Sequence, residues 1–387
     1  MSPKVRIGDI AKVGAGQGAP QDPSAFSDEG YPFIRAGSLD ALCIGGDIRS
    51  LERISEARAK RHRMKLYPKS TVVFAKSGMS ATKNRVFVLP EQAYVVSHLA
   101  TLEVKPHVDP TWLQYFWEHY CPGNLIQDPA YPSISLEAIS NVEIELPPLP
   151  EQKRIAAILA KADRLRRLRR TARDLSDTYL QSVFLEMFGD PVSNPMGWEK
   201  TKLGSLCQII RGASPRPIKD FLGGTVPWVK IGDGTQGDDL CITSTKDHII
   251  EEGVSKSVFL KSGSLVFANC GVSLGFARIL KIDGCIHDGW LAFNEIDERR
   301  IHPVFLLKAL NQITPYLRSL APTGTQPNLN TGIMKMLHVI LPPLPLQQQF
   351  ARTVHKFERL RAQQDEAERQ AGHLFQTLLQ RAFRGEL

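Results

Sequence analysis

Basic and small polar residues cluster in segments of the sequence that have the composition of loops. The clearest cluster runs from Lys76 to Arg85, between two short runs rich in valine, so a hairpin with a basic tip is expected there. Lysine and arginine side chains bind phosphate oxygens or guanine edges, and serine and asparagine can add hydrogen bonds to either. The chemistry that these residue types offer is recognition of nucleic acid.

Similar clusters occur at three other places in the sequence. One precedes the hairpin at residues 60–63, one lies in a loop rich in glycine and proline at 211–219, and one occupies a second hairpin tip at 269–273. We predict nucleic-acid contacts for Lys60, Arg61, Arg63, Lys76, Ser77, Lys83, Asn84, Arg85, Arg211, Arg216, Lys219, Asn269 and Ser273. For each residue taken alone, the alternative is an ordinary solvated surface position.

Signature motifs of enzymes are missing from the sequence. It has no Gly-x-x-x-x-Gly-Lys-Ser/Thr loop for nucleotide phosphates, no His-Glu-x-x-His or Gly-x-Ser-x-Gly motif and no kinase motif set. The Asn/Asp-Pro-Pro-Tyr/Phe stretch of amino-methyltransferases is also absent, because Asn194-Pro195-Met196 fails at its third position. His287-Asp288 is suggestive only in isolation, since such a pair more often caps a strand. We predict a non-catalytic binding protein.

The composition is that of a mildly basic globular protein. Its 387 residues suffice for two domains with separate cores, and the formal net charge of +8 favours a polyanionic partner. The six cysteines include no Cys-x-x-Cys pair, so we expect reduced thiols and no metal site. No apolar run reaches the roughly 18 residues of a membrane helix, and the N-terminal segment lacks a signal-peptide core. We expect a cytoplasmic protein with no membrane partner.

A proline-rich motif occurs twice and marks the elements that must position these loops. Leu146-Pro-Pro-Leu-Pro-Glu-Gln152 recurs as Leu341-Pro-Pro-Leu-Pro-Leu-Gln347, 195 residues later. Each copy follows an alternating strand pattern and precedes a long stretch of helical composition. Proline has a fixed φ and no backbone donor, so a proline cluster suits a helix start. The placement of both copies argues against a pair of plain linkers.

The segments before the two motifs also repeat. Each of the following pairs is separated by 193 to 195 residues: Pro32–Arg35 with Pro227–Lys230, Thr71–Ala75 with Ser264–Ala268, and Asp109–Leu113 with His302–Leu306. The loops between these anchors differ in length and composition. The sequence therefore predicts a duplicated framework whose loop chemistry has diverged.

Two long helices are predicted over residues 151–188 and 346–384. A helix of about 38 residues is roughly 57 Å long. Apolar residues follow heptads at Ile158, Leu165, Leu168, Ala172, Leu175 and Tyr179, and at Phe357, Leu360, Ala367, Ala371, Leu374 and Leu378. The first helix is strongly basic between Lys153 and Arg173. This basic face could be solvated, or it could contact nucleic acid or an acidic partner surface. The seams predict an antiparallel pair within one chain, and a parallel coiled coil between two chains is the alternative.

The predicted fold class is α+β, with a pseudo-two-fold internal repeat. It has two similar α/β domains separated by two long helices that form an antiparallel intramolecular coiled coil. The predicted segments are a first recognition domain at 1–146, the first proline motif and helix at 147–190, a second recognition domain at 191–341, and the second proline motif and helix at 342–387.

This arrangement resembles the specificity subunit of type I restriction–modification enzymes. The resemblance rests on both proline motifs, on Lys153-Arg154-Ile155-Ala156 after the first, and on the ending Arg381–Leu387. Gly324-Thr325-Gln326-Pro327-Asn328 also matches the family, whereas its first-half counterpart, Asp128–Ser133, departs from it. The resemblance covers the whole chain, but the recognition loops carry no motif that transfers.

The resemblance implies a division of labour among subunits. Each domain would read half of a split site in double-stranded DNA, and the helices would dock two methyltransferase subunits. Those subunits would hold S-adenosylmethionine, so no cofactor is expected in this chain, and motor-nuclease subunits would join for restriction. A stand-alone DNA-binding regulator and a coiled-coil adaptor without a DNA role are the alternatives.

Overall fold

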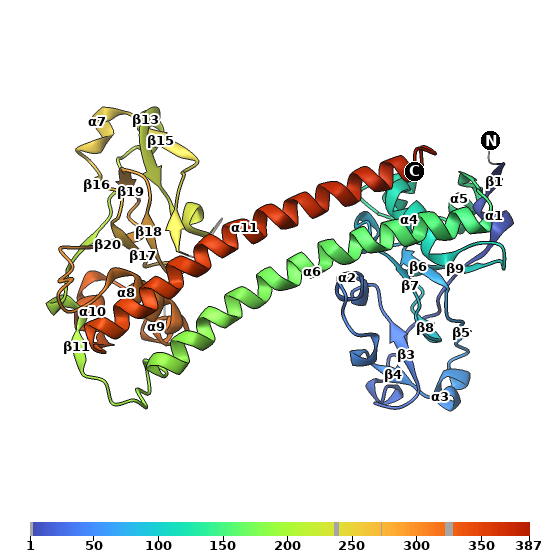
Figure 1. Cartoon of the computed structure of the whole chain (residues 1–387), viewed down its shortest axis with the longest axis horizontal. Coiled ribbons are helices and arrows are strands. Elements are labelled where there is room, and N and C mark those ends of the chain that lie inside the picture. Colours follow the sequence, from blue (N-terminus) through green and yellow to red (C-terminus); the bar gives the residue numbers. More distant parts are fainter. Residues whose placement is uncertain (1–2, 236–239, 272, 322–327) are drawn as a thin grey trace. The chain divides into compact units, whose positions relative to one another are not determined.

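The protein divides into two compact units that share the two long helices. The structure, a computed structural model, describes residues 3–235, 240–271, 273–321 and 328–387, with the backbone alone for 176–178. Unit 1 comprises Met1–Ala172 and Gln364–Leu387, and unit 2 comprises Arg173–Gln363. Each long helix therefore has one end in each unit (Figure 1). Among the described helices, none combines the length and apolar character that a membrane span requires.

Unit 1 contains two four-stranded sheets and a short strand pair. The antiparallel sheet has the order β2 (Ala11–Ala15), β9 (Leu99–Val104), β6 (Val72–Ala75), β7 (Val86–Val88). The mixed sheet has the order β4 (Arg53–Ile54), β3 (Tyr31–Ile34), β8 (Ala93–Val95), β5 (Leu66–Tyr67), with β3 and β8 parallel. The strand pair is β1 (Lys4–Arg6) with β10 (Glu143–Glu145). The helices are α1 (Ile7–Ile10), α2 (Ser38–Cys43), α3 (Glu56–Arg61), α4 (Pro110–Tyr120) and α5 (Leu136–Asn141).

Unit 2 repeats this topology strand for strand. Its larger sheet has the order β12 (Gln208–Arg211), β20 (Trp290–Asn294), β17 (Leu265–Ala268), β18 (Ala277–Leu280), β14 (Cys241–Ile242). The second sheet has the order β15 (Asp247–Ile249), β13 (Leu222–Val229), β19 (Gly284–Ile286), β16 (Val258–Leu260), and β11 (Lys200–Lys202) pairs with β21 (His338–Ile340). The helices are α7 (Glu251–Val254), α8 (Pro303–Gln312), α9 (Thr314–Leu320) and α10 (Thr331–Met336). Among the described strands of unit 2, β14 alone lacks a counterpart in unit 1, and the predicted internal repeat is confirmed.

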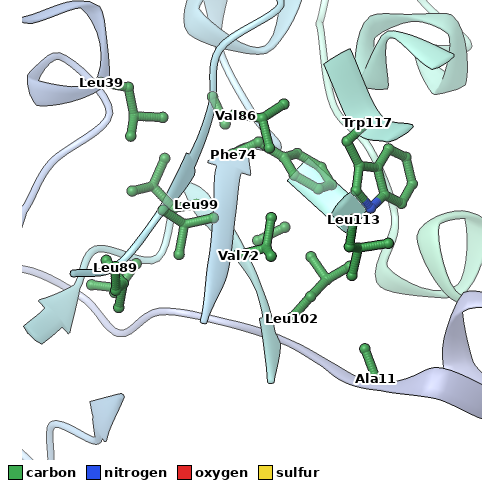
Figure 2. Packing of buried hydrophobic residues seen from close by; sticks show 14 of the residues in the cluster. Ala11, Leu39, Val72, Phe74, Val86, Leu89, Leu99, Leu102, Leu113 and Trp117 are labelled. Carbon is green, nitrogen blue, oxygen red and sulfur yellow. The ribbon is translucent and has the colours of Figure 1, made fainter. Parts of the chain in front are cut away.

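The core of each unit lies where the antiparallel sheet meets a helix. All four residues of β6 are buried, which fits the run of β-branched residues in this strand. Figure 2 shows Phe74 of β6 and Trp117 of α4 facing each other, with 4.8 Å between ring centroids. Helix α4 begins as its sequence predicts, because the Asp109 side chain accepts a hydrogen bond from the Trp112 N–H and Pro110 occupies the first turn.

The long helices are α6 (Leu149–Phe188) and α11 (Leu344–Ala382). In unit 1 the first half of α6 packs against the last turns of α11, with the Arg166 guanidinium 4.3 Å from the Phe375 ring centroid. In unit 2 the end of α6 packs against the start of α11, and the rings of Phe188 and Phe350 lie 5.4 Å apart. The two helices therefore run in opposite directions within one chain, as predicted.

The predicted seam of α6 is wrong at several positions. Leu168 and Leu175 are 57% and 63% exposed, and Leu165 is also exposed. Tyr179, although exposed, stacks on Phe357 of α11 with 5.1 Å between ring centroids, so the seam is confirmed at this pair. The buried residues near the start of α6 are Ile155, Ala156, Leu159 and Ala162. The ends of the helix face the cores of the units as well as the partner helix, so the buried stripe is set by both. On α11, Ala371 is buried as predicted, whereas Leu360 and Leu374 are exposed.

The last residue of each proline motif is a buried glutamine that ties three segments together. In unit 1, Gln152 Oε1 accepts the backbone N–H of Asp109 at 2.8 Å. Its Nε2 donates to the carbonyl oxygens of Pro147 at 2.8 Å and His107 at 3.2 Å. This one side chain links the start of α6 to the proline loop and to the N-terminus of α4.

Gln347 repeats these contacts in unit 2. Its Oε1 accepts the N–H of His302 at 2.8 Å, and its Nε2 donates to Pro342 O at 2.7 Å and Arg300 O at 3.0 Å. Gln152 and Gln347 are 1% and 0% exposed, so the backbone groups that they bind have no ready substitute in water. The prolines begin the helix, and the glutamine fixes the helix to its unit.

We predict that Gln347→Ala destabilises the protein by about 2–4 kcal/mol, because it leaves three buried backbone groups without their partner. Gln348→Ala is the matched control, since Gln348 is the next residue of the same helix and is exposed. Urea unfolding of the full chain, followed by circular dichroism, measures both variants. Equal stability of the two variants would contradict this role for Gln347.

Candidate nucleic-acid interface

In each unit a tight backbone crossing brings distant polar residues together. The segment after β2 passes directly over the β8–β9 turn (residues 96–98), where the Gln17 N–H donates to Val95 O at 2.9 Å. The segment after β12 crosses the β19–β20 turn (residues 287–289) in the same way, and the Ala213 N–H donates to Ile286 O at 3.2 Å. The same place in both units is therefore built from the same backbone contacts.

A glycine makes each crossing possible. A Cβ atom at Gly16 would lie 2.1 Å from Val95 O, and one at Gly212 would lie 2.2 Å from His287 O. Both distances are far below van der Waals contact, so neither position accepts a side chain without a backbone shift. Gly16 and Gly212 therefore have a steric role, which composition alone did not reveal.

In unit 1 the crossing carries Lys76, Ser77 and His98. Ser77 Oγ lies 2.7 Å from His98 Nδ1, and the backbone N–H of Lys76 donates to His98 O at 2.9 Å. The backbone of Ser77 also forms an isolated β-bridge with that of Ser133, so the end of the segment 128–133 lies against this site. Of the residues predicted to contact nucleic acid, the structure brings Lys76 and Ser77 together here and adds His98, which the sequence analysis did not select.

The rest of the predicted hairpin tip is bound to other elements of unit 1. Lys83 Nζ lies 2.5 Å from Asp40 Oδ2, and Arg85 Nε lies 3.2 Å from Asp40 Oδ1. The hydrogen bond from Lys83 outweighs burial and lowers the pKa of Asp40. Asn84 Nδ2 donates to the backbone oxygen of Glu118 at 2.6 Å. These three residues join α2 and α4 to the hairpin, and their contact with nucleic acid stays a prediction.

The second basic cluster of unit 1 is exposed. Lys60 and Arg61 end α3, and Arg63 follows in a turn with a φ of 51°. All three side chains are exposed. Cations at the C-terminal end of a helix interact favourably with its dipole, which accounts for their position without a ligand. Their contact with DNA also stays a prediction.

In unit 2 the crossing carries a network centred on Asp288. Its Oδ1 accepts the Ser214 hydroxyl at 2.8 Å and lies 3.0 Å from His287 Nε2. Arg216 Nη2 lies 3.5 Å from Oδ2, and Arg211 Nε donates to the Asp288 backbone oxygen at 2.9 Å. The structure thus brings together two predicted residues, Arg211 and Arg216. Lys219, a third, lies exposed in the turn Ile218–Phe221.

Protonation states in this network follow from its geometry. Burial lowers the pKa of His287, and Asp288 offsets only part of the shift, so the ring is neutral at pH 7. His287 Nδ1 accepts the Gly289 N–H at 2.9 Å, so the ring proton lies on Nε2, which is 3.0 Å from Asp288 Oδ1. Burial raises the pKa of Asp288, but Ser214, His287 and Arg211 outweigh burial and hold it below its usual value. Asp288 is therefore ionised.

A buried side chain and a backbone β-bridge hold the second hairpin tip in place. Asn269 is fully buried, and its Nδ2 donates to Asn328 Oδ1 at 3.2 Å. The backbone of Cys270 forms an isolated β-bridge with that of Asn328, and this β-bridge matches the one between Ser77 and Ser133 in unit 1. Ser273 is half-buried. Of the family-like segment 324–328, residues 324–327 lie outside the described residues. Asn269 therefore supports the site from within, and its predicted base contact is untested.

Comparison with known families identifies this architecture. The sequence matches the family described as "Type I restriction modification DNA specificity domain" twice, over residues 2–173 and 195–369. The chain belongs to this family. The two matches together span most of the 387 residues, and each coincides with one copy of the repeat and the first part of the long helix that follows it.

Individual members of the specificity family resemble parts of the chain. The MjaIX type I restriction enzyme specificity subunit of Methanocaldococcus jannaschii is 30% identical over 148 residues, or 38% of this chain and 34% of that protein. The HindI specificity subunit of Haemophilus influenzae is 29% identical over 154 residues, or 38% of this chain and 32% of that protein. The aligned part of the chain therefore spans about a third of the length of each relative.

Solved structures of the specificity family share the fold. A chain from a study of complex assembly and conformational transition in a type I R-M system superposes with a TM-score of 0.60, at 21% identity and full coverage of both chains. The S subunit from M. genitalium gives 0.57 at 16% identity, covering 99% of this chain and 96% of that one. Within the described residues, no group of three His, Cys, Asp or Glu side chains could hold a metal ion.

We predict that Gly16→Ala destabilises the protein by about 3 kcal/mol, because the new Cβ forces the two backbone segments of the crossing apart. Gly18→Ala is the control, since a Cβ at Gly18 meets nothing within 4 Å. That substitution should leave stability unchanged or raise it by a few tenths of a kcal/mol. Thermal unfolding measures both variants. A Gly16→Ala protein with an unchanged melting temperature would show that the crossing accepts a Cβ atom without strain.

Proposed function

We propose that this chain is the DNA-recognition subunit of a type I restriction–modification complex and reads a bipartite site, one unit per half-site. The observation that supports this most directly is the pair of crossings. The strand order is repeated, yet unit 1 has Ala15 and Ser97 at the positions that Arg211 and Asp288 occupy in unit 2. A repeated framework with different polar groups suits two different half-sites.

DNA binding would combine a general and a specific part. The net charge of +8 attracts the phosphate backbone, and this attraction weakens as salt rises. Exposed basic residues such as Lys60, Arg61 and Lys219 suit phosphate contacts, which position a protein on the duplex. The residues at the two crossings would supply base contacts, since their side chains are held by neighbours and so have a defined direction.

The long helices would hold the partner subunits. Exposed leucines on α6, at Leu165 and Leu168 in unit 1 and Leu175 and Leu185 in unit 2, leave apolar surface that the chain itself does not cover. Such surface is typical of protein interfaces. We assign it to two methyltransferase subunits, which would bring S-adenosylmethionine, and motor-nuclease subunits would join for restriction. A helix of about 40 residues is roughly 60 Å long, so unread bases should separate the half-sites.

The purified chain alone should transfer no methyl groups to DNA, because it supplies only recognition. Addition of the cognate methyltransferase subunits should give adenine methylation at one split sequence, measured by mapping methylated bases in plasmid DNA. Methyl transfer by the chain alone would contradict the proposal. DNA binding without any functional methyltransferase partner would favour a stand-alone regulator, and a complex whose DNA binding is absent or insensitive to salt would favour an adaptor.

Exchange of residues 1–146 for the same segment of a relative with another specificity should change one half-site and leave the other intact. The reciprocal exchange of residues 191–341 is the control, and it should change the other half-site only. Methylation mapping of both hybrid complexes reads the outcome. A change in both half-sites after either exchange would rule out independent reading.

A further inference from the structure

Asp288 lies at the centre of unit 2's crossing and has two arginines as neighbours. Arg211 reaches it from the end of β12, and Arg216 reaches it from the following loop. Arg211 and Asp288 are 77 residues apart in sequence, so the fold alone brings them together. The three groups carry two positive charges and one negative charge, which leaves a net positive site.

The neutral neighbours of Asp288 determine which of its carboxylate oxygens faces an arginine. Ser214 donates to Oδ1, and the neutral ring of His287 lies 3.0 Å from the same oxygen, so this oxygen faces groups without charge. Oδ2 is the oxygen that faces Arg216. Ser214 donates to the carboxylate and Gly289 holds the neighbouring His287 ring, so the carboxylate has a defined direction. The carboxylate therefore offers Arg216 a defined partner on one side.

Both arginines keep hydrogen-bonding capacity for a ligand. A guanidinium has five N–H donors in one plane. The bond to Asp288 uses the Nε–H of Arg211. The side chain of Arg216 is 80% exposed and meets Asp288 through Nη2 at 3.5 Å. Each guanidinium therefore contacts Asp288 through one nitrogen and leaves its other N–H groups available to a ligand.

We propose, on the basis of the proposed function, that Arg211 and Arg216 read guanine in the second half-site and that Asp288 positions them. An arginine fork matches the O6 and N7 acceptors of guanine in the major groove. Adenine instead suits the amide of asparagine or glutamine. Asp288 offsets one of the two positive charges, which weakens the attraction of this site for a phosphate. Unit 1 has Ala15 at the position of Arg211 and Ser97 at the position of Asp288, so the effect belongs to one half-site.

The experiment uses the full complex with its methyltransferase subunits. Methylation mapping first defines the wild-type site, and the half read by residues 191–341 should contain guanine on one strand. Competition binding then compares the wild-type duplex with a duplex in which that guanine pair is replaced. Arg216→Ala should lower this discrimination roughly 10- to 100-fold. Discrimination in the first half-site should be unchanged.

Asp288→Asn separates positioning from mere structural support. The amide keeps an oxygen for Ser214, and the backbone oxygen still accepts from Arg211, but no carboxylate charge remains to attract Arg216. We expect discrimination at the guanine to fall roughly tenfold while binding to unrelated DNA becomes tighter, because a negative charge near the backbone is lost. A purely structural role would instead lower the melting temperature and weaken binding to all sequences. The matched control is Asp297→Asn, whose partner Arg299 lies 3.1 Å away in the same unit.

Three results would overturn the inference. The first is a second half-site without guanine. The second is an Arg216→Ala complex that binds all sequences more weakly and with a smaller salt dependence, which is the behaviour of a phosphate contact. The third is a wild-type complex without a split recognition site, in which case the proposed function fails and this inference fails with it.

Discussion

The glutamine that ends each proline motif is the contact on which the rest of each unit depends. Its buried amide satisfies three backbone groups at once, one in the proline loop and two in the segment that leads into the domain helix. Because one rigid side chain joins a domain helix, the proline loop and a long helix, the direction in which that helix leaves its unit follows from hydrogen-bond geometry. Gln152 and Gln347 make matching contacts, so both units hold their helices in the same way.

The crossings show how a fixed framework carries variable chemistry. Gly16 and Gly212 let one backbone segment lie on another, and these contacts involve no side chain from the crossing strand. Neighbouring side chains can then change without loss of the backbone arrangement. Unit 1 has a serine, a lysine and a histidine at this place, and unit 2 has a carboxylate with two arginines.

Sequence reasoning found the repeat, the proline motifs and the long helices, because these are local patterns with a fixed spacing. It placed the seam of α6 on Leu168 and Leu175, which are exposed, because heptads cannot tell a face that binds the chain itself from one left open. It also missed the role of Gln152, since a glutamine in a helix is usually a surface residue. At the candidate site, the side-chain interactions of Asp288 and the burial of Asn269 arise from segments far apart in sequence.

The short strand pairs give each recognition domain adjoining ends. In unit 1, Val5 of β1 lies opposite Ile144 of β10, and in unit 2, Thr201 of β11 lies opposite Val339 of β21. A segment whose two ends are neighbours can be removed or replaced as a cassette, since its entry and exit share one small seam. Recombination between genes therefore needs to match only two nearby backbone positions to give a folded protein. Under the proposed function, such a design would let one exchange change the DNA target of a half-site without altering the surfaces that partner subunits contact.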